Sequence, residues 1–451
     1  MSTRRSTRRS AYAVAFGLAL ILSGCFGRGG EEEGDSNAIS VWMFPQGDDE
    51  VAIRAFEAAY EEANEGKDVE VVVYPEEEYQ TRINTALVAG SPPDVAIIEN
   101  RNWMKAGYVV ELTDQFSEWG VSIEDFNQGG LSRGAVEADP SEGVYGVGTF
   151  LGGNVLVYNK ELFDAAGLDH PSLDESMTIE QYAELCRALG QPSDDPAENV
   201  FGCAMPDFAF SFYPIYGEDG RTAEGNMNAP ELADAFELGA SLINDGLAPS
   251  PSVLETVTEA DLFAQGLIAM TWSDFSAVPL YEEAGVEFGM APFFVIEGQE
   301  DFVDTWTAAW GTFEDSPHPE DAMSFLEFIA TDAQRIQMEE TPDPPLSATV
   351  AEEAGFGDDD PVKAEFLQVL ENARPLVFVP PGEEAWDPAE VLRLLTVEEQ
   401  TDAQAILDEM AADAQAQLDA VWERWDALDR EQFEEEVEEE QAEASASPEE
   451  P

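Results

Sequence analysis

Strand-like and helix-like segments alternate near the start of the chain, and this alternation limits its fold more than any other feature. The strand-like runs are rich in β-branched and aromatic residues, and the segments between them have the apolar spacing of amphipathic helices. Because this order produces parallel strands with helices on both faces, we predict an α/β fold. Ligands bind beyond the carboxyl ends of such strands. The five segments occupy residues 38–44, 51–63, 69–74, 79–89 and 95–98, and the loops of interest are 45–49, 75–78 and 99–103.

The length of the chain predicts a second unit of the same kind. Its 451 residues exceed the roughly 250 to 300 at which a single core stops growing. Beyond Gly146 the pattern restarts with an extended, glycine-interrupted run over 144–158, and Thr178 with Gln181 forms a capping box that opens a helix. Further strand-like runs lie at 266–272 and 286–294, and helical spacing marks a helix that begins near Pro319 and another segment at 403–428.

The N-terminus has the pattern of a signal peptide. The basic stretch Ser2–Arg9 precedes twelve apolar or small residues, too few for a membrane-spanning helix of about 20 residues. The run ends in Leu-Ser-Gly-Cys, which resembles the lipobox of bacterial-type lipoproteins. That resemblance implies that residues 1–24 are removed, that Cys25 carries the lipid, and that residues 25–37 form a flexible tether on the outer face of the cell membrane. A secreted protein with an incidental cysteine is the alternative, and twin-arginine and general export both stay open.

The charge of the chain excludes one class of partner. Lys and Arg number 20, Asp and Glu number 95, and the net charge is −75. Without the four arginines of residues 1–24, 16 basic and 95 acidic residues remain, a net charge of −79. Nucleic acid is excluded because its phosphate backbone is bound by clustered Lys and Arg. Such an acidic surface repels itself unless salt screens it, which indicates a saline habitat.

Two cysteines remain outside the membrane after export. Cys186 lies in a helical segment and Cys203 in a loop-like one, and a disulfide between them would close a loop of roughly 17 residues. Two buried free thiols are the alternative.

Several further segments occur in the order typical of one family. They are Ala89–Val95 (AGSPPDV), Val144–Val147 (VYGV), Leu156–Phe163 (LVYNKELF), Ala166–Leu168 (AGL), Phe263–Met270 (FAQGLIAM) and Ser316–Gln334. This ordered set resembles the extracellular solute-binding proteins of family 1, the maltose-binding-protein-like receptors of carbohydrate ABC transporters. The resemblance implies a two-lobed periplasmic-binding-protein-like fold of type II, each lobe a mostly parallel sheet flanked by helices, closing on a ligand by hinge motion.

By that resemblance the chain crosses between lobes near 148–153, 270–272 and 328–331. The N-terminal lobe is expected to comprise 38–149 and 272–330, and the C-terminal lobe 150–271 and 331–430. Gly148, Gly152 and Gly153 suit a hinge because glycine tolerates dihedral angles that other residues do not, although a bulged strand explains them equally well. Residues 431–451 contain ten glutamates and few apolar residues, and we expect a disordered tail.

A sugar site needs aromatic platforms for the flat faces of the rings and polar groups for the hydroxyls at their edges. Candidates follow the expected strands, lie at the crossing, or sit in aromatic segments of the second half. They are Phe44, Gln46, Asp48, Glu99, Asn100, Trp103, Asn154, Phe212, Tyr213, Tyr216, Trp272, Asp274, Trp306, Trp310, Gly311, Arg374 and Trp386.

An enzyme is the main alternative from another class. Paired carboxylates carry out glycoside hydrolysis, so a secreted polysaccharide-degrading enzyme stays open, although pairs are uninformative in so acidic a chain. The two histidines, His170 and His318, each precede a proline in a loop, and no Ser-His-Asp triad, HExxH motif or zinc spacing is visible. The acidic stretch at 357–360 does not match an EF-hand loop, which leaves a calcium-stabilised scaffold unsupported.

The sequence therefore predicts a lipid-anchored, monomeric solute receptor that is not an enzyme and has no cofactor or metal. It would capture a carbohydrate and deliver it to the membrane subunits of an ABC importer. Glycerol-phosphate, polyamines and iron complexes remain alternative solutes.

Overall fold

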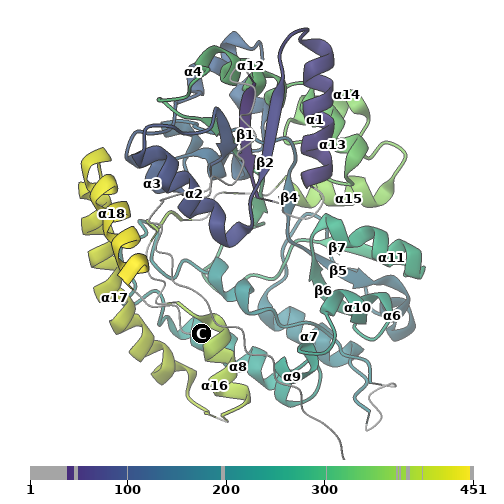
Figure 1. Cartoon of the computed structure of the whole chain (residues 1–451). Helices are drawn as coiled ribbons and strands as arrows, with labels where there is room; N and C mark the ends of the chain where they lie inside the picture. The colour runs from purple at the N-terminus through teal and green to yellow at the C-terminus, as the bar shows by residue number, and fades with distance from the viewer. Residues whose placement is uncertain are drawn as a thin grey trace, which may run out of the picture. The chain divides into compact units, whose positions relative to one another are not determined.

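The computed structural model describes residues 38–44, 49–98, 100–193, 199–300, 302–371, 374, 377–381, 386–398 and 400–446. A four-stranded and a three-stranded β-sheet organise these residues, each covered by its own helices, and a two-stranded sheet is present as well (Figure 1). We call the elements around the first sheet the N-terminal lobe and those around the second the C-terminal lobe. The predictions for Cys25, for the tether and for the signal peptide concern residues outside the described ranges.

The first sheet has the predicted alternation of strands and helices. Its strand order is β2-β1-β3-β9, with β1 parallel to β2 and to β3, and β9 antiparallel to β3. The main elements of this lobe are β1 (Ile39–Met43), α1 (Asp49–Ala63), β2 (Val69–Val73), α2 (Glu76–Val88), β3 (Val95–Ile97), α3 (Arg101–Lys105), α4 (Thr113–Glu118), α5 (Gln128–Leu131), β9 (Trp310–Thr312), α12 (Pro319–Ala330), α13 (Ala333–Glu340) and α14 (Ala348–Ala354). Single 3-10 turns span Ile123–Asp125, Ser132–Gly134 and Pro140–Glu142.

Asp94, in the turn before β3, forms hydrogen bonds that connect distant segments of this sheet. Its side chain is 1% exposed and accepts hydrogen bonds from the Ser40 backbone N–H (2.9 Å), the Ser316 hydroxyl (2.7 Å) and the His318 backbone N–H (2.9 Å). The His318 ring Nδ1 lies 3.1 Å from the same carboxylate. A buried carboxylate requires this many donors. Asp94 thus joins β1 to the turn before α12, which lies more than 200 residues later in the chain.

The second sheet has the strand order β6-β5-β7, and both outer strands are antiparallel to β5. The expectation of a mostly parallel sheet is wrong for these named strands; it holds for the first sheet. The elements of this lobe are β5 (Val155–Asn159), α6 (Lys160–Ala166), α7 (Ile179–Leu189), a 3-10 helix (Asp207–Phe212), α8 (Pro230–Asn244), α9 (Pro251–Leu254), α10 (Glu259–Ala264), β6 (Met270–Ser273), a 3-10 turn (Phe275–Ala277), α11 (Val278–Ala284), β7 (Phe288–Ala291), α15 (Pro361–Leu370), α16 (Pro388–Thr396) and α17 (Ala403–Ala427).

Local signals explain where the helices of this lobe begin and end. Thr178 and Gln181 form the predicted capping box at the start of α7. Gly167, with φ 69°, ends α6 in the left-handed conformation that favours glycine. Cys186 on α7 is joined to Cys203 by a disulfide, with Cα atoms 5.1 Å apart.

The lobe boundaries differ from the sequence prediction at two places. Because β6 and β7 pair with β5, residues 272–291 belong to the C-terminal lobe rather than the N-terminal one. The chain returns to the first sheet through β8 (Thr305–Trp306), which pairs with β4 (Gly152–Gly153). Residues 333–354 stay with the N-terminal lobe, since α13 packs on α1, and the chain crosses again before α15, which packs on β7. Periodicity along the chain does not show which sheet a strand joins, so the lobe boundaries predicted from the sequence were wrong for these segments.

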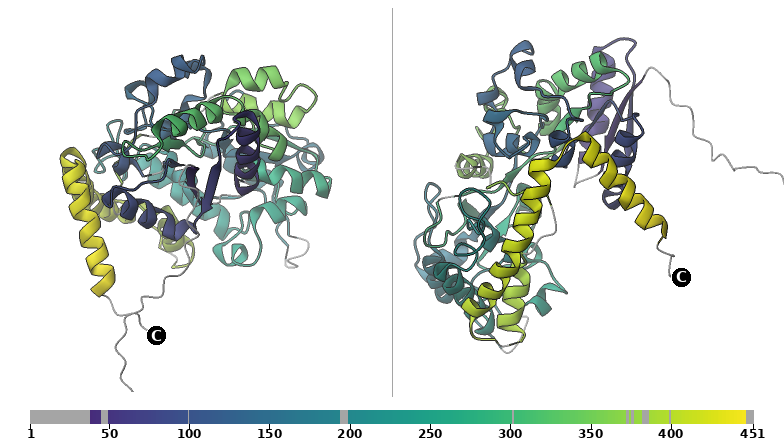
Figure 2. Two further views of the ribbon diagram at one scale, coloured as in Figure 1. Left: turned by 45° about the horizontal axis from the view of Figure 1, so that its top comes forward. Right: turned by 90° about the vertical axis from the view of Figure 1, so that its left-hand side faces the viewer.

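The prediction for the acidic C-terminal segment was wrong. Residues 430–446 form a helix, α18 (Arg430–Ala446), rather than a disordered tail. Phe433 and Val437 are each 3% exposed, and α18 packs on α2 of the N-terminal lobe, whereas α17 packs on α8 of the C-terminal lobe (Figures 1 and 2). Two apolar residues four positions apart are enough to dock one face of a helix that is otherwise rich in glutamate. Residues 447–451 lie outside the described ranges.

Candidate functional site

A cavity of about 930 Å³ lies between residues of the two lobes. The N-terminal lobe contributes the start of α3, immediately beyond β3, together with the turn at 132–134. The C-terminal lobe contributes the 3-10 helix at 207–212 with the loop after it, the segment 298–305 and one face of α17. This size and the position beyond the carboxyl end of a parallel strand are those of a small-molecule site.

Aromatic rings form one wall of this cavity. They are Phe212, Tyr213, Tyr216, Phe302 and Trp386. The rings of Phe212 and Phe302 pack with their centroids 5.0 Å apart. The Trp386 indole N–H donates to the Ser211 hydroxyl at 2.8 Å, which fixes the orientation of that ring. Burial, and secondarily the charge of Glu231, raise the pKa of the Tyr213 phenol, so Tyr213 is a neutral hydrogen-bonding group at physiological pH.

Three arginines line the same cavity. Arg133 is paired with Asp304 at 3.3 Å, and Arg374 with Glu300 at 2.8 Å. Arg101 instead donates to backbone carbonyls, from Nε to Ala135 (3.2 Å) and from Nη2 to Ser132 (3.1 Å). These bonds hold the guanidinium of Arg101 in place without neutralising it.

Asp304 connects the cavity to the crossing strands. Its side chain is 15% exposed and accepts hydrogen bonds from Arg133 Nη2 and from Asn154 Nδ2, each at 3.3 Å. Burial raises the pKa of this carboxyl, and Arg133 and Asn154 oppose that rise. Asp304 lies directly before β8, so any change in the β4–β8 pair would move it and its partners together.

The structure brings some of the predicted ligand residues to this cavity and leaves others elsewhere. Phe212, Tyr213, Tyr216, Arg374 and Trp386 line it, and Asn154 contacts its Asp304. The predicted residues Gln46, Asp48 and Glu99 lie outside the described residues.

Four predicted contacts belong to the core of the N-terminal lobe instead. Phe44 and Trp103 are 1% and 0% exposed, and the Trp103 indole N–H donates to Asn84 at 2.7 Å. Trp310 and Gly311 form part of β9, where a Cβ atom at Gly311 would lie 2.6 Å from the Tyr145 carbonyl oxygen. An aromatic residue at a strand end can face the sheet or the cavity, and the sequence pattern is the same in both cases.

The other predicted residues have structural contacts outside the cavity wall. Asn100 caps α3 by accepting from the Asn102 backbone N–H at 3.0 Å, and Asp274 caps the 3-10 turn at 275–277. Trp272 packs edge-on against Phe208 with ring centroids 4.9 Å apart. Trp306 lies on β8 opposite Gly152.

Glycine is required at the proposed hinge positions because neighbouring side chains lie too close to the backbone to leave room for a Cβ atom. A Cβ atom at Gly148 would overlap Thr307, and one at Gly152 would overlap the Trp306 indole. Gly148, Gly152 and Gly153 all lack a positive φ, so a left-handed backbone is not the reason for glycine at these positions. Hinge motion at these residues stays a prediction.

Sequence reasoning missed Arg101, Arg133 and Asp304, and also the wall formed by α17. That wall consists of Ala414, Gln417, Leu418 and Val421. One signal was present: basic residues are scarce in this chain, so each arginine outside the signal segment was a candidate for a specific role.

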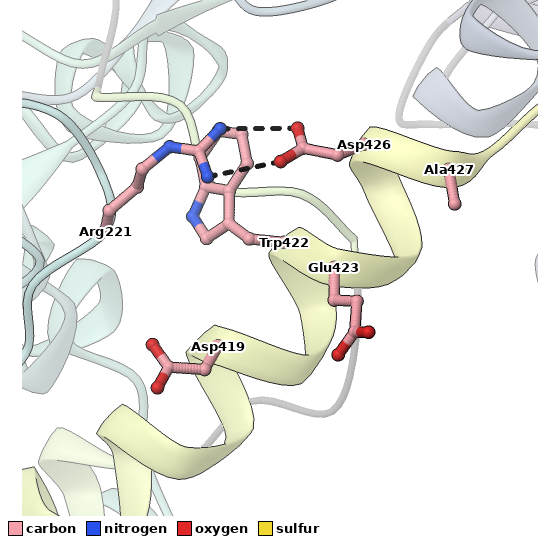
Figure 3. Close-up of a pocket in the computed structure, with 6 residues that line it drawn as sticks. All are labelled: Arg221, Asp419, Trp422, Glu423, Asp426 and Ala427. Atoms are coloured by element: carbon pink, nitrogen blue, oxygen red, sulfur yellow. Dashed lines mark hydrogen bonds and ion pairs between the residues drawn. The ribbon is translucent and has the colours of Figure 1, made fainter.

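A second hollow, on the surface of α17, is a structural clamp (Figure 3). The Arg221 guanidinium lies 3.6 Å from the Trp422 ring centroid and is paired with Asp426 at 3.3 Å. The Trp422 indole N–H donates to the Gly220 carbonyl at 2.7 Å. These contacts fasten the loop at 217–222 to the helix whose other residues line the cavity.

The described residues contain no group of His, Cys, Asp and Glu side chains suited to a metal ion. Within the same ranges no helix is both long and apolar enough to cross a membrane.

Comparison with known proteins defines the class of this chain. The sequence profile of the family described as bacterial extracellular solute-binding protein matches residues 46–336. The chain belongs to this family, and its fold is that of the two-lobed, type II, maltose-binding-protein-like members.

Individual relatives agree with this assignment. A binding protein of Brucella abortus is 25% identical over 288 residues, which cover 60% of this chain and 66% of that protein. A protein of Escherichia coli K12 named as the ABC transporter periplasmic-binding protein YcjN is 24% identical over 76% of this chain and 80% of its own length.

Solved structures share the fold at low sequence identity. The sugar-binding protein MalE from Xanthomonas citri has a TM-score of 0.68 and 17% identity, covering 86% of this chain and 98% of that chain. The ABC substrate-binding protein Lmo0181 from Listeria monocytogenes, in complex with cycloalternan, has a TM-score of 0.61 and 19% identity, covering 86% and 99%.

Proposed function

We propose that this chain is a receptor that captures a carbohydrate in the cavity between its lobes and delivers it to the membrane subunits of an ABC importer. The observation that carries the proposal is the cavity of about 930 Å³, whose wall combines aromatic rings with arginine, carboxylate and hydroxyl groups. Sugars present flat apolar faces and a rim of hydroxyls, which such a wall complements. The sugar-binding protein of Xanthomonas citri and the cycloalternan complex of Listeria monocytogenes support a saccharide ligand.

Closure of the lobes would complete the site. Groups from both lobes line the cavity, so a ligand that contacts both stabilises the closed arrangement over the open one. We propose that the monomeric, closed and liganded form is the one that docks on the permease. The β4–β8 pair is the connection about which this motion would occur.

We further propose that Cys25 anchors the receptor by lipid to the outer face of the cell membrane. The support is the apolar run ending in Leu22-Ser23-Gly24-Cys25. Replacing Cys25 with Ser should move the protein from the membrane fraction to the soluble fraction of an expressing bacterium. Retention in the membrane fraction would argue against the lipid anchor.

The acidic composition supports a saline medium for this receptor. Molar salt reduces the Debye length to about 3 Å and screens repulsion among carboxylates. The melting temperature of the purified protein should therefore rise between dilute buffer and molar KCl. An unchanged melting temperature would contradict the saline proposal and leave carbohydrate binding untouched.

A titration with a panel of neutral and acidic oligosaccharides tests the binding function. Calorimetry and melting temperature should detect at least one saccharide, and Trp386→Ala should weaken its binding about tenfold by removing an aromatic platform. Trp119→Ala is the matched control, since Trp119 packs on Phe116 of the N-terminal lobe and does not line the cavity. If no saccharide binds, or if the two variants lose affinity equally, the proposal fails.

A further inference from the structure

The charge of the cavity differs from that of the chain around it. Outside the signal segment, basic residues are outnumbered by 95 acidic ones to 16. The described lining of the cavity nevertheless contains as many arginines as carboxylates. They are Arg101, Arg133 and Arg374 against Glu218, Glu300 and Asp304. The described lining is therefore neutral within a strongly anionic protein.

Among the described lining residues, the two ion pairs leave over one arginine, Arg101, and one exposed carboxylate, Glu218. Arg133 is paired with Asp304, and Arg374 with Glu300. Among the described residues Arg101 has no carboxylate partner; its contacts are two backbone carbonyls and the ring of Phe378, 5.4 Å from the guanidinium carbon. A cation in this position keeps its full charge toward the cavity.

The environment of Arg101 makes that charge costly. Burial, with a smaller contribution from the nearby charge of Arg133, lowers the pKa of Arg101 to about 10, which still leaves it cationic at neutral pH. A neutral saccharide would not offset this cost, because its hydroxyl groups carry no charge opposite to that of the guanidinium. An anion would offset it, since it restores the missing opposite charge.

The geometry of Arg101 limits the kind of anion. Two nitrogens of its guanidinium are held by carbonyls of the 132–135 segment, which leaves Nη1 as the nitrogen without a partner among the described residues. Nη1, together with the second hydrogen of Nη2, forms a guanidinium edge that can bind a carboxylate through two parallel hydrogen bonds. One unpaired positive charge also balances one carboxylate, whereas a phosphate dianion would leave a negative charge in excess.

We propose that the cavity is selective for acidic saccharides, that is, for sugars that contain a uronic acid, and that Arg101 receives the carboxylate with Arg133 beside it. This inference rests on the proposed carbohydrate-binding function and names its substrate class. In a receptor that repels anions at long range, a locally neutral site with one unpaired arginine would allow an acidic sugar to bind.

Matched acids and esters test this selectivity. Calorimetry on the purified protein would compare disaccharides of galacturonate, glucuronate and mannuronate with their methyl esters, which keep the ring and lose the charge. At least one acid should bind about ten to a hundred times more tightly than its ester. Arg101→Gln should remove most of this difference and leave the affinity for the ester within about threefold. Arg82→Gln is the control, because it deletes the same charge from an exposed ion pair with Glu78 on α2, outside the cavity lining, and should leave both affinities unchanged.

The outcomes separate this inference from the proposed function. If a neutral saccharide or the ester binds as tightly as every acid, the selectivity is refuted and carbohydrate binding stands. If sulfated or phosphorylated sugars bind more tightly than all the uronates, the carboxylate assignment is refuted. If no saccharide of either charge binds, both proposals fail. Should Arg101→Gln not fold, Arg133→Gln replaces it: it leaves Asp304 uncompensated beside the site, so affinity for the acid should fall more than affinity for the ester.

Discussion

Replacing Phe433 with Ala should release α18 from the N-terminal lobe. Phe433 is 3% exposed, and its ring packs against Tyr108 with centroids 5.2 Å apart. Val437, one turn further on, is also buried, at 3% exposure. Polar and cation–π contacts accompany these two side chains. Tyr108 donates to Glu434 at 3.0 Å, and the Arg430 guanidinium carbon lies 4.2 Å from the Tyr108 ring centroid. Arg430 is paired with Asp315 at 3.0 Å, and Arg424 of α17 is paired with Glu436 at 2.6 Å.

The size of the effect follows from these contacts. Burial of one such side chain contributes about 1.5–3 kcal/mol, and exposed ion pairs contribute about 1 kcal/mol or less. Phe433 therefore provides roughly half of the apolar docking free energy. Its loss, about 2–3 kcal/mol, should raise the opening equilibrium of α18 by about 30- to 150-fold.

Hydrogen exchange followed by mass spectrometry measures this opening directly. Peptides from 430–446 should exchange faster in Phe433→Ala by the factor above, while those from β1 and β3 should keep the protection of the wild type. Glu435→Ala, an exposed position on the same helix, is the control and should leave exchange unchanged. Unaltered exchange of α18 in Phe433→Ala, or equal acceleration in β1, would refute the idea that this helix is docked as a separate unit by Phe433.

Three further substitutions test the supporting structure. Asp94→Ala removes the acceptor of the Ser40 backbone N–H and one acceptor of the His318 backbone N–H, and it should lower the free energy of unfolding by about 3–5 kcal/mol in denaturant titrations. A loss below about 1 kcal/mol would contradict the role of this carboxylate. Asp304→Asn tests the raised pKa of Asp304, because the folded state favours the protonated carboxyl. As the pH rises from below 3.8, the usual pKa, through the raised pKa, the wild type should lose stability relative to the variant in melting curves from about pH 3 to 7. The opposite trend would mean that Arg133 outweighs burial. Reduction of the Cys186–Cys203 disulfide, whose cysteines are 17 residues apart, should lower the free energy of unfolding by about 3 kcal/mol, and a Cys203→Ser variant should then be insensitive to reductant.

The N-terminal lobe was predictable because its order is local. Each strand of β1, β2 and β3 is followed or preceded by a helix close in sequence, so apolar periodicity alone specified the parallel arrangement. The pairing of β6 and β7 with β5, and the return through β8 to β9, depend on contacts between residues more than 100 positions apart. Such pairings have no periodic signal, and the boundaries expected at 272 and 331 were wrong for that reason.

The residues of the candidate site were likewise only partly predictable from the sequence. The aromatic loop containing Phe212, Tyr213 and Tyr216 was recognisable by composition, and it lies in the cavity wall. Trp103 and Trp310 had an equally suggestive sequence context and are buried in the core. Whether a side chain at a strand end faces the sheet or the cavity is decided by the elements packed around it.

By itself, the sequence determined the family, the succession of strands and helices in the N-terminal lobe and the overall acidity, because each depends on residue type and spacing along the chain. Only the tertiary structure decided where the few basic residues meet. Arg101 follows β3, Arg133 lies in the 3-10 turn at 132–134 and Arg374 lies shortly after α15, yet all three line one cavity. Charge balance at a site depends on the distances between charged groups in space. Those distances are set when the two lobes fold around the cavity.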